Sequence, residues 1–146
     1  MNAEETLSSL LDEMIPPSPD RGMPGAGAVS LGLGPRIRAE VPDIAPLVDS
    51  ALAALHAKAL ERGAESFAGL AAEDRTALVK QLADEQPMVI PALQFHLYCF
   101  YYAMPEVLEA LGMPGRPPHP DGYEMEENEL GLLEAVRARE KIYREA

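Results

Sequence analysis

The side chains of this chain that could carry chemistry are few and lie far apart in the sequence. The three histidines, His56, His96 and His119, have no histidine or glutamate at the spacing that a helical metal site needs. No Gly-x-Ser-x-Gly motif, serine–histidine–aspartate signature or P-loop is present. His96 lies in an aromatic segment, where a hydrogen-bonded core histidine is the favoured interpretation and a metal ligand the alternative. We therefore expect no catalytic residue and no metal site.

The single cysteine, Cys99, excludes several redox centres. One cysteine cannot form an internal disulfide, a Cys-rich zinc site, an iron–sulfur cluster or a c-type haem attachment motif. Its neighbours are apolar, so we expect a buried and unreactive thiol. Gly25-Ala26-Gly27 lacks the third glycine and the preceding strand of a dinucleotide-binding loop. No cofactor is therefore expected in this chain, and a redox role would need another protein to carry the electrons.

The composition indicates one acidic, globular domain covering residues 1–146. The chain has 47% apolar residues, a mean hydropathy of −0.10 and a net charge of −12. Nucleic acid and anionic membrane surfaces would both repel so acidic a protein. The charge is interpreted as an aid to solubility, in preference to a site for a basic partner.

The chain ends and apolar stretches bear on localisation. The first residues lack the basic and apolar segments of a secretory signal, and there is no twin arginine. The longest apolar stretch, residues 88–104, is shorter than the about 20 residues that a membrane span needs, and it is interrupted by Pro91, Gln94 and His96. The sequence as written predicts a cytoplasmic protein without direct membrane insertion.

Hydrophobic periodicity predicts an all-α fold, an irregular bundle of about five to six helices with two long Pro/Gly-rich loops. Residues 16–42 contain too many prolines and glycines for a regular helix. This stretch is either a packed loop or a segment that orders against a partner. The second loop covers residues 112–123. The expected helices cover residues 3–15, 43–62, 72–84, 87–103, 105–111 and 126–144.

The expected helix over residues 87–103 holds five of the eight aromatic residues. Because it is apolar on nearly every side, it is either the central helix or half of an interface. Its tyrosines could form a protein-binding surface, or they could point inward with their hydroxyls at the rim. The composition leaves these two interpretations open.

Taken in order, several weak motifs resemble the gluconate 2-dehydrogenase subunit 3 family over roughly residues 4–125. The first helix ends in Leu10-Leu11-Asp12-Glu13-Met14-Ile15-Pro16-Pro17, and Pro24-Gly25-Ala26 follows. The similarity continues through residues 67–82, which include Asp74-Arg75. The last motifs are Phe100-Tyr101-Tyr102, Leu111-Gly112-Met113-Pro114-Gly115 and Asp121-Gly122-Tyr123.

The resemblance implies a non-catalytic small subunit of a sugar or sugar-acid dehydrogenase. In that family the large subunit is an FAD enzyme of the glucose–methanol–choline (GMC) type, and a cytochrome c subunit often accepts the electrons. The small subunit helps the large one to mature, and many members carry a twin-arginine signal. Since no such signal is present here, a periplasmic location would require a partner that carries it.

The motif positions and the aromatic composition together give the expected partner interface. A different interpretation is a free-standing helical homodimer that uses the same aromatic surface on itself. A third, an unrecognised metal enzyme, would depend on His96. The residues expected at the interface are Phe95, Tyr98, Tyr101, Tyr102, Pro114 and Tyr123.

Overall fold

The first helix, α1 (Ala3–Met14), begins and ends where its sequence predicts. In the computed structural model, which describes residues 2–115 and 132–139, the Oδ1 of Asn2 accepts a hydrogen bond from the backbone N of Glu5 at 3.2 Å. This satisfies one of the amides that a helix start leaves without a partner. The leucines at positions 7, 10 and 11 are buried, and Pro16 and Pro17 prevent the helix from continuing.

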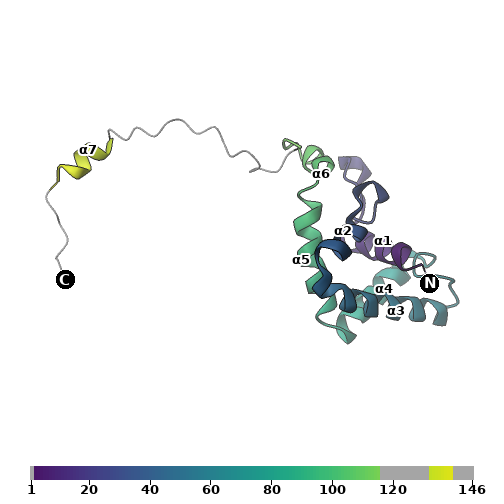
Figure 1. The fold of residues 1–146 in the computed structure, drawn as a ribbon. Coiled ribbons are helices and arrows are strands. Elements are labelled where there is room, and N and C mark those ends of the chain that lie inside the picture. The colour runs from purple at the N-terminus through teal and green to yellow at the C-terminus, as the bar shows by residue number, and fades with distance from the viewer. Residues whose placement is uncertain (1, 116–131, 140–146) are drawn as a thin grey trace, which may run out of the picture.

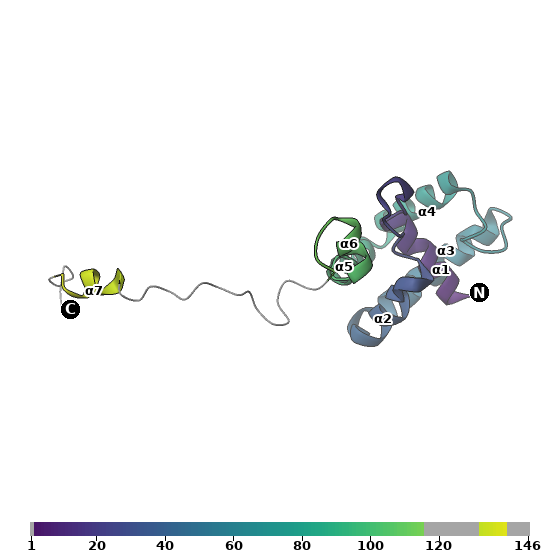
Figure 2. The same ribbon diagram turned by 90° about the horizontal axis from the view of Figure 1, so that it is seen from above.

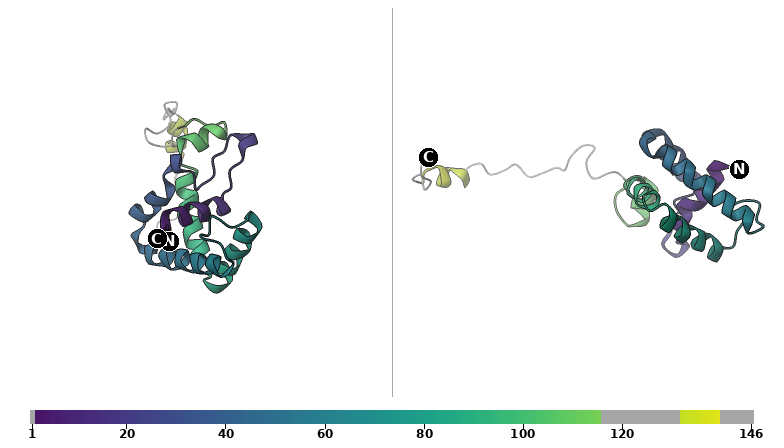
Figure 3. Two further views of the ribbon diagram at one scale, coloured as in Figure 1. Left: turned by 90° about the vertical axis from the view of Figure 1, so that its right-hand side faces the viewer. Right: turned by 90° about the horizontal axis from the view of Figure 1, so that it is seen from below.

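Three helices complete the centre of the bundle with α1. The helix α3 (Ala45–Glu61) contacts α4 (Ala72–Glu85), and α1 contacts both. The helix α5 (Val89–Tyr101) runs across the direction of α1 and α3 (Figures 1 and 3). Viewed from above, α5 lies at one side of the bundle and is seen nearly end-on (Figure 2). One face of α5 is therefore available to pack inward while the opposite face points away from the other helices.

The expectation that residues 16–42 hold no regular helix is wrong for α2 (Leu33–Glu40). Pro35 is the third residue of α2, in the first turn, where a missing N–H costs no helical hydrogen bond. Leu33 and Ile37 are one helical turn apart and both are buried. The rest of this stretch forms short 3₁₀ turns, η1 (Pro19–Arg21), η2 (Val29–Leu31) and η3 (Pro42–Ile44).

The prediction of an all-α fold is confirmed. The described residues contain seven α-helices, including α6 (Pro105–Ala110) and α7 (Leu132–Arg137), and the only strand-like pairing among them is an isolated bridge between Ser18 and Met23. Most of the helix expected over residues 126–144 lies outside the described residues. Within the described part of the chain, no helix has both the length and the apolar character needed to cross a bilayer.

A largely buried ion pair joins α1 to α4. The Nε of Arg75 donates to Glu13 Oε1 at 2.7 Å, and the hydroxyl of Thr76 donates to Glu13 Oε2 at 2.8 Å. Arg75 also donates to the carbonyl of Leu70 at 2.8 Å. The side chain of Glu13 is only 13% exposed, so the loss of its carboxylate would leave the charge of the partly buried Arg75 without an ion-pair partner.

We therefore expect Glu13→Ala to lower the free energy of unfolding by about 1–3 kcal/mol. Glu85→Ala is the matched control, because Glu85 binds Lys58 at the surface and that hydrogen bond lowers the pKa of Glu85. The control variant should lose much less stability, since solvent screens an exposed pair. Urea unfolding of both variants would measure the difference, and equal losses would contradict the role given to Glu13.

Candidate partner-binding surface

The glycine-rich segment after α1 is a loop that packs against this helix. The backbone N of Gly27 donates to Asp12 Oδ1 at 2.8 Å, and the backbone N of Ala26 donates to the carbonyl of Ile15 at 3.0 Å. A side chain at Gly27 would collide with the carbonyl oxygen of Ser8, and one at Gly25 would collide with Asp12. Residues 16–28 therefore lie directly on α1, and glycine is needed for that close approach.

Tyr101 ties this loop to α5. Its hydroxyl donates to the carbonyl of Pro24 at 2.6 Å, and its side chain is 0% exposed. Burial raises the pKa of Tyr101 above its ordinary value, and the nearby Tyr102 and Asp12 raise it further by smaller amounts. Tyr101 was expected at the partner interface, but in this structure it is a core residue that holds the loop in place.

Because the folded-state pKa of Tyr101 is raised, its contribution to stability is present below about pH 10 and is lost as the pH rises through the folded-state pKa. We expect Tyr101→Phe to lower the free energy of unfolding by about 1 kcal/mol at neutral pH, through loss of the hydrogen bond to Pro24. The variant should then lose less additional stability than wild type when the pH is raised above about 10. Urea unfolding of wild type and Tyr101→Phe at neutral pH and above about pH 10 would test this. Equal losses of stability in the two proteins between these pH values would contradict it.

The two faces of α5 differ sharply in exposure, so of the two interpretations left open, α5 is not a central helix covered on every side. The inward face is formed by the buried residues Val89, Leu93, Leu97 and Tyr101, which recur every four residues. On the opposite face Met88 is 69% exposed and Phe95 is 65% exposed. Cys99 is also exposed, which corrects the expectation of a buried thiol. We call Met88, Phe95, Tyr98 and Tyr102 the aromatic surface.

The aromatic surface carries no formal charge. Residues 86–105 contain no aspartate, glutamate, lysine or arginine, in a chain that is 25% charged. Tyr98 packs edge-to-face on Tyr102 with ring centroids 5.9 Å apart, and the hydroxyl of Tyr98 accepts a hydrogen bond from Gln94 at 2.9 Å. An exposed apolar helix face with tyrosines and methionine is typical of a protein–protein interface.

The segment after α5 extends this surface. Val107 and Leu108 of α6 are buried and hold that helix against the bundle, while Leu111, Met113 and Pro114 are exposed. Phe95, Tyr98, Tyr102 and Pro114 are thus placed where a partner could reach them. Tyr123, the remaining residue expected at the interface, lies outside the described residues.

A cavity of about 490 Å³ continues the surface beyond Tyr102. It lies between residues 15–23 on one side and the end of α5 with α6 on the other; the η1 segment lies beside α6 in Figures 1 and 3. Neither this cavity nor the exposure of Met88 and Leu111 follows from sequence motifs. Positions 88, 95, 98 and 102 share one helical face, but the face formed by positions 89, 93, 97 and 101 is apolar as well. The cavity is lined by Ile15, Pro16, Ser18, Arg21, Met23, Tyr101, Tyr102, Ala110 and Leu111.

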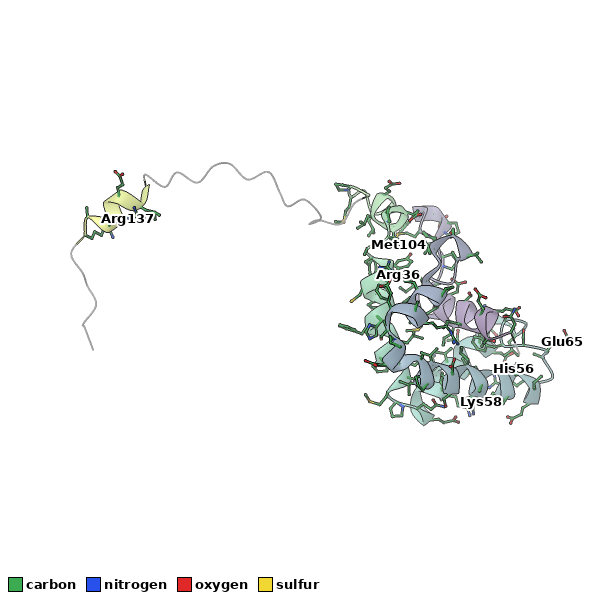
Figure 4. All side chains as sticks on the ribbon, viewed as in Figure 1. Arg36, His56, Lys58, Glu65, Met104 and Arg137 are labelled. Atoms are coloured by element: carbon green, nitrogen blue, oxygen red, sulfur yellow. The ribbon has the colours of Figure 1, made fainter. Side chains whose placement is uncertain are left out.

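Arg36 fixes the inner side of α5 at its C-terminal end. Its guanidinium lies 4.4 Å from the ring centroid of Phe100, and its Nη1 is 3.9 Å from the Sδ of Met104, beside which it lies in Figure 4. Its Nε also donates to Glu40 at 2.9 Å. This cation–π contact joins α2 to α5 and holds the aromatic surface on a rigid support.

The histidines show no catalytic arrangement in the described part of the chain. His96 is half-buried and packs edge-to-face on Phe95, with ring centroids 5.1 Å apart, so it is not a hydrogen-bonded core residue. The Nδ1 of His56 is buried without a hydrogen-bond partner among the described residues. His119 lies outside them. Among residues 2–115 and 132–139, no group of three or more histidine, cysteine, aspartate or glutamate side chains could hold a metal ion.

The fold and the site together define a helical protein with a preformed, uncharged aromatic surface, a class suited to assembly with other chains. A family model described as gluconate 2-dehydrogenase subunit 3 matches residues 2–111, which span α1 to α6. This chain belongs to the gluconate 2-dehydrogenase subunit 3 family, as the order of its motifs predicts, and the family name denotes one subunit of a dehydrogenase complex. Neither the search of curated proteins nor the search of solved structures gave a match.

Proposed function

We propose that this chain is a non-catalytic accessory subunit of an FAD-dependent sugar or sugar-acid dehydrogenase, and that it binds and stabilises the GMC-type flavoprotein subunit. The observation that carries the proposal is the aromatic surface on α5, which is exposed while the opposite face of the same helix is fully packed. Membership of a family named as a dehydrogenase subunit supports the kind of complex.

The energetics favour a covered aromatic surface. Burying one large apolar side chain such as Phe95 or Met88 gains about 1.5–3 kcal/mol relative to leaving it in water. The inner face of α5 is already held by Tyr101 and by the stacking of Arg36 on Phe100, so binding need not order the helix. A preorganised surface loses less conformational entropy on association and so binds more tightly.

The proposed division of labour assigns the redox chemistry to other subunits. The flavoprotein would hold the FAD and oxidise the sugar, and a cytochrome c subunit would accept the electrons. This chain would shield an apolar area of the flavoprotein during folding and assembly, and its compartment would be that of its partner.

The test is expression of the flavoprotein subunit with and without this chain. We expect co-expression to give a stable complex that contains both chains, flavin absorbance and sugar dehydrogenase activity, whereas the flavoprotein alone should be poorly soluble or deficient in flavin. Equal yield, flavin content and activity without this chain would overturn the proposal.

Light scattering on the isolated chain separates the proposal from a homodimer. A tight dimer that persists on dilution and does not exchange for the flavoprotein would favour self-association through the aromatic surface. A monomer, or a weak association that the flavoprotein displaces, supports the accessory role.

A further inference from the structure

We propose that the cavity beside the aromatic surface receives an extended segment of the partner subunit, in which a carboxylate next to an apolar side chain pairs with Arg21. The inference rests on the proposed function, and it adds the chemistry that the partner must present. The cavity supplies an apolar wall from Ile15, Met23 and Leu111 and a single cationic side chain from Arg21.

Arg21 carries a charge that no carboxylate among the described residues neutralises. Residues 2–115 contain five arginines, and the four at positions 36, 38, 62 and 75 each form an ion pair with a carboxylate. Arg21 forms no such pair within the described residues and is exposed at the cavity. A guanidinium binds a carboxylate through two parallel hydrogen bonds, so Arg21 can pair with an acidic group that a partner presents at the cavity.

The wall of the cavity that carries Arg21 is held by backbone hydrogen bonds. Ser18 and Met23 exchange backbone hydrogen bonds of 2.9 and 3.0 Å, and the backbone N of Arg21 donates to the carbonyl of Ser18 at 3.0 Å. Gly22 closes this turn at a φ of 65°, and Tyr101 fixes Pro24 from behind. The wall that carries Arg21 is thus formed before any partner arrives.

Continuity with the aromatic surface identifies the occupant as part of the protein partner. Tyr102 belongs to the aromatic surface and also lines the cavity, and Leu111 lines the cavity while being exposed beside that surface. A partner that covers Phe95 and Tyr98 therefore lies next to the cavity opening. In a chain of net charge −12, an arginine at this position attracts an acidic segment where most of the protein would repel it.

The experiment measures the affinity of the purified flavoprotein subunit for this chain and its Arg21→Ala, Arg21→Glu and Lys80→Glu variants at two salt concentrations. Arg21→Glu is expected to weaken binding by about tenfold or more, and Arg21→Ala by less, with a smaller salt dependence than wild type. Lys80→Glu makes the same charge change on α4, away from the cavity, and should bind like wild type. Arg21 variants that bind like wild type, or a Lys80→Glu variant that is equally weakened, would overturn the inference.

A Phe95→Glu variant in the same assay distinguishes failure of the Arg21 inference from failure of the proposed function. If Phe95→Glu abolishes binding and the Arg21 variants do not weaken it, the accessory role stands and the inference is wrong. If the flavoprotein binds neither wild type nor any variant, the proposed function itself fails.

Overlapping peptides that span the flavoprotein sequence provide a second measurement. Peptides that bind wild type but not Arg21→Glu should contain an aspartate or glutamate beside an apolar residue, and replacing that acid by alanine should remove binding. Equal binding of acidic and neutral peptides would contradict the assigned occupant.

Discussion

A glutamate in place of Phe95 is expected to weaken the complex with the flavoprotein subunit by about 100-fold or more, which corresponds to about 3 kcal/mol. Phe95 lies at the middle of the outward face of α5 and is 65% exposed in the isolated chain. The substitution would place a charge on a surface that carries none from residue 86 to residue 105, and the charge would lose its hydration when the partner covers it.

Leu60→Glu is the matched control for this prediction. Leu60 lies on α3, is also apolar and is 53% exposed, so the same substitution there changes the charge of the chain equally. Both variants should keep the circular dichroism and melting temperature of wild type within a few degrees, since neither side chain is in the core. Titration of each variant with the flavoprotein measures the effect. An intact complex with Phe95→Glu would contradict the assignment of this surface.

The largest expected loss of stability comes from Gly27→Ala. An added Cβ would collide with the carbonyl oxygen of Ser8 and would lie 2.8 Å from the Cγ of Asp12. The Ser8 carbonyl belongs to the backbone of α1 and cannot rotate away, so the loop would have to move and break the Gly27 hydrogen bond to Asp12. We expect the free energy of unfolding to fall by about 2–4 kcal/mol.

Gly69→Ala tests whether the effect is specific to this close approach. A Cβ at Gly69 would lie 3.5 Å from its nearest neighbour, the carbonyl oxygen of Ser66, which is an ordinary contact. That variant should change stability by about 0.5 kcal/mol or less, in either direction. Thermal and urea unfolding of both variants would measure the difference, and a stable Gly27→Ala protein would show that the loop does not depend on α1.

The helices that the sequence predicts well are those with a clear periodic stripe. The buried residues of α1 and α3 recur at helical spacing, because one face of each helix packs against the bundle. For α5 the sequence is apolar on both faces, so it does not say which face is inward. The tertiary contacts of Tyr101 decide that question.

The remaining features depend on contacts between residues distant in the sequence. The helix α2 forms because Pro35 falls in its first turn and because the burial of Leu33 and Ile37 in the bundle outweighs the low helix propensity of Gly34. The cavity is formed by residues 15–23 together with residues 101–111, and no local sequence pattern predicts that these two segments lie side by side. For the same reason the exposure of Cys99 could not be read from its apolar neighbours.

The hydrogen bond between Tyr101 and Pro24 makes the aromatic surface and the cavity depend on residues that line neither of them. One wall of the cavity is attached to α1 through Asp12 and Gly27, and the other belongs to the helix that Tyr101 anchors. A genetic screen for loss of assembly should therefore recover lesions at Ser8, Asp12 and Gly27, which do not line the cavity, as readily as lesions in the outward residues of α5. The first group would be rescued by lower growth temperature, and the second would not.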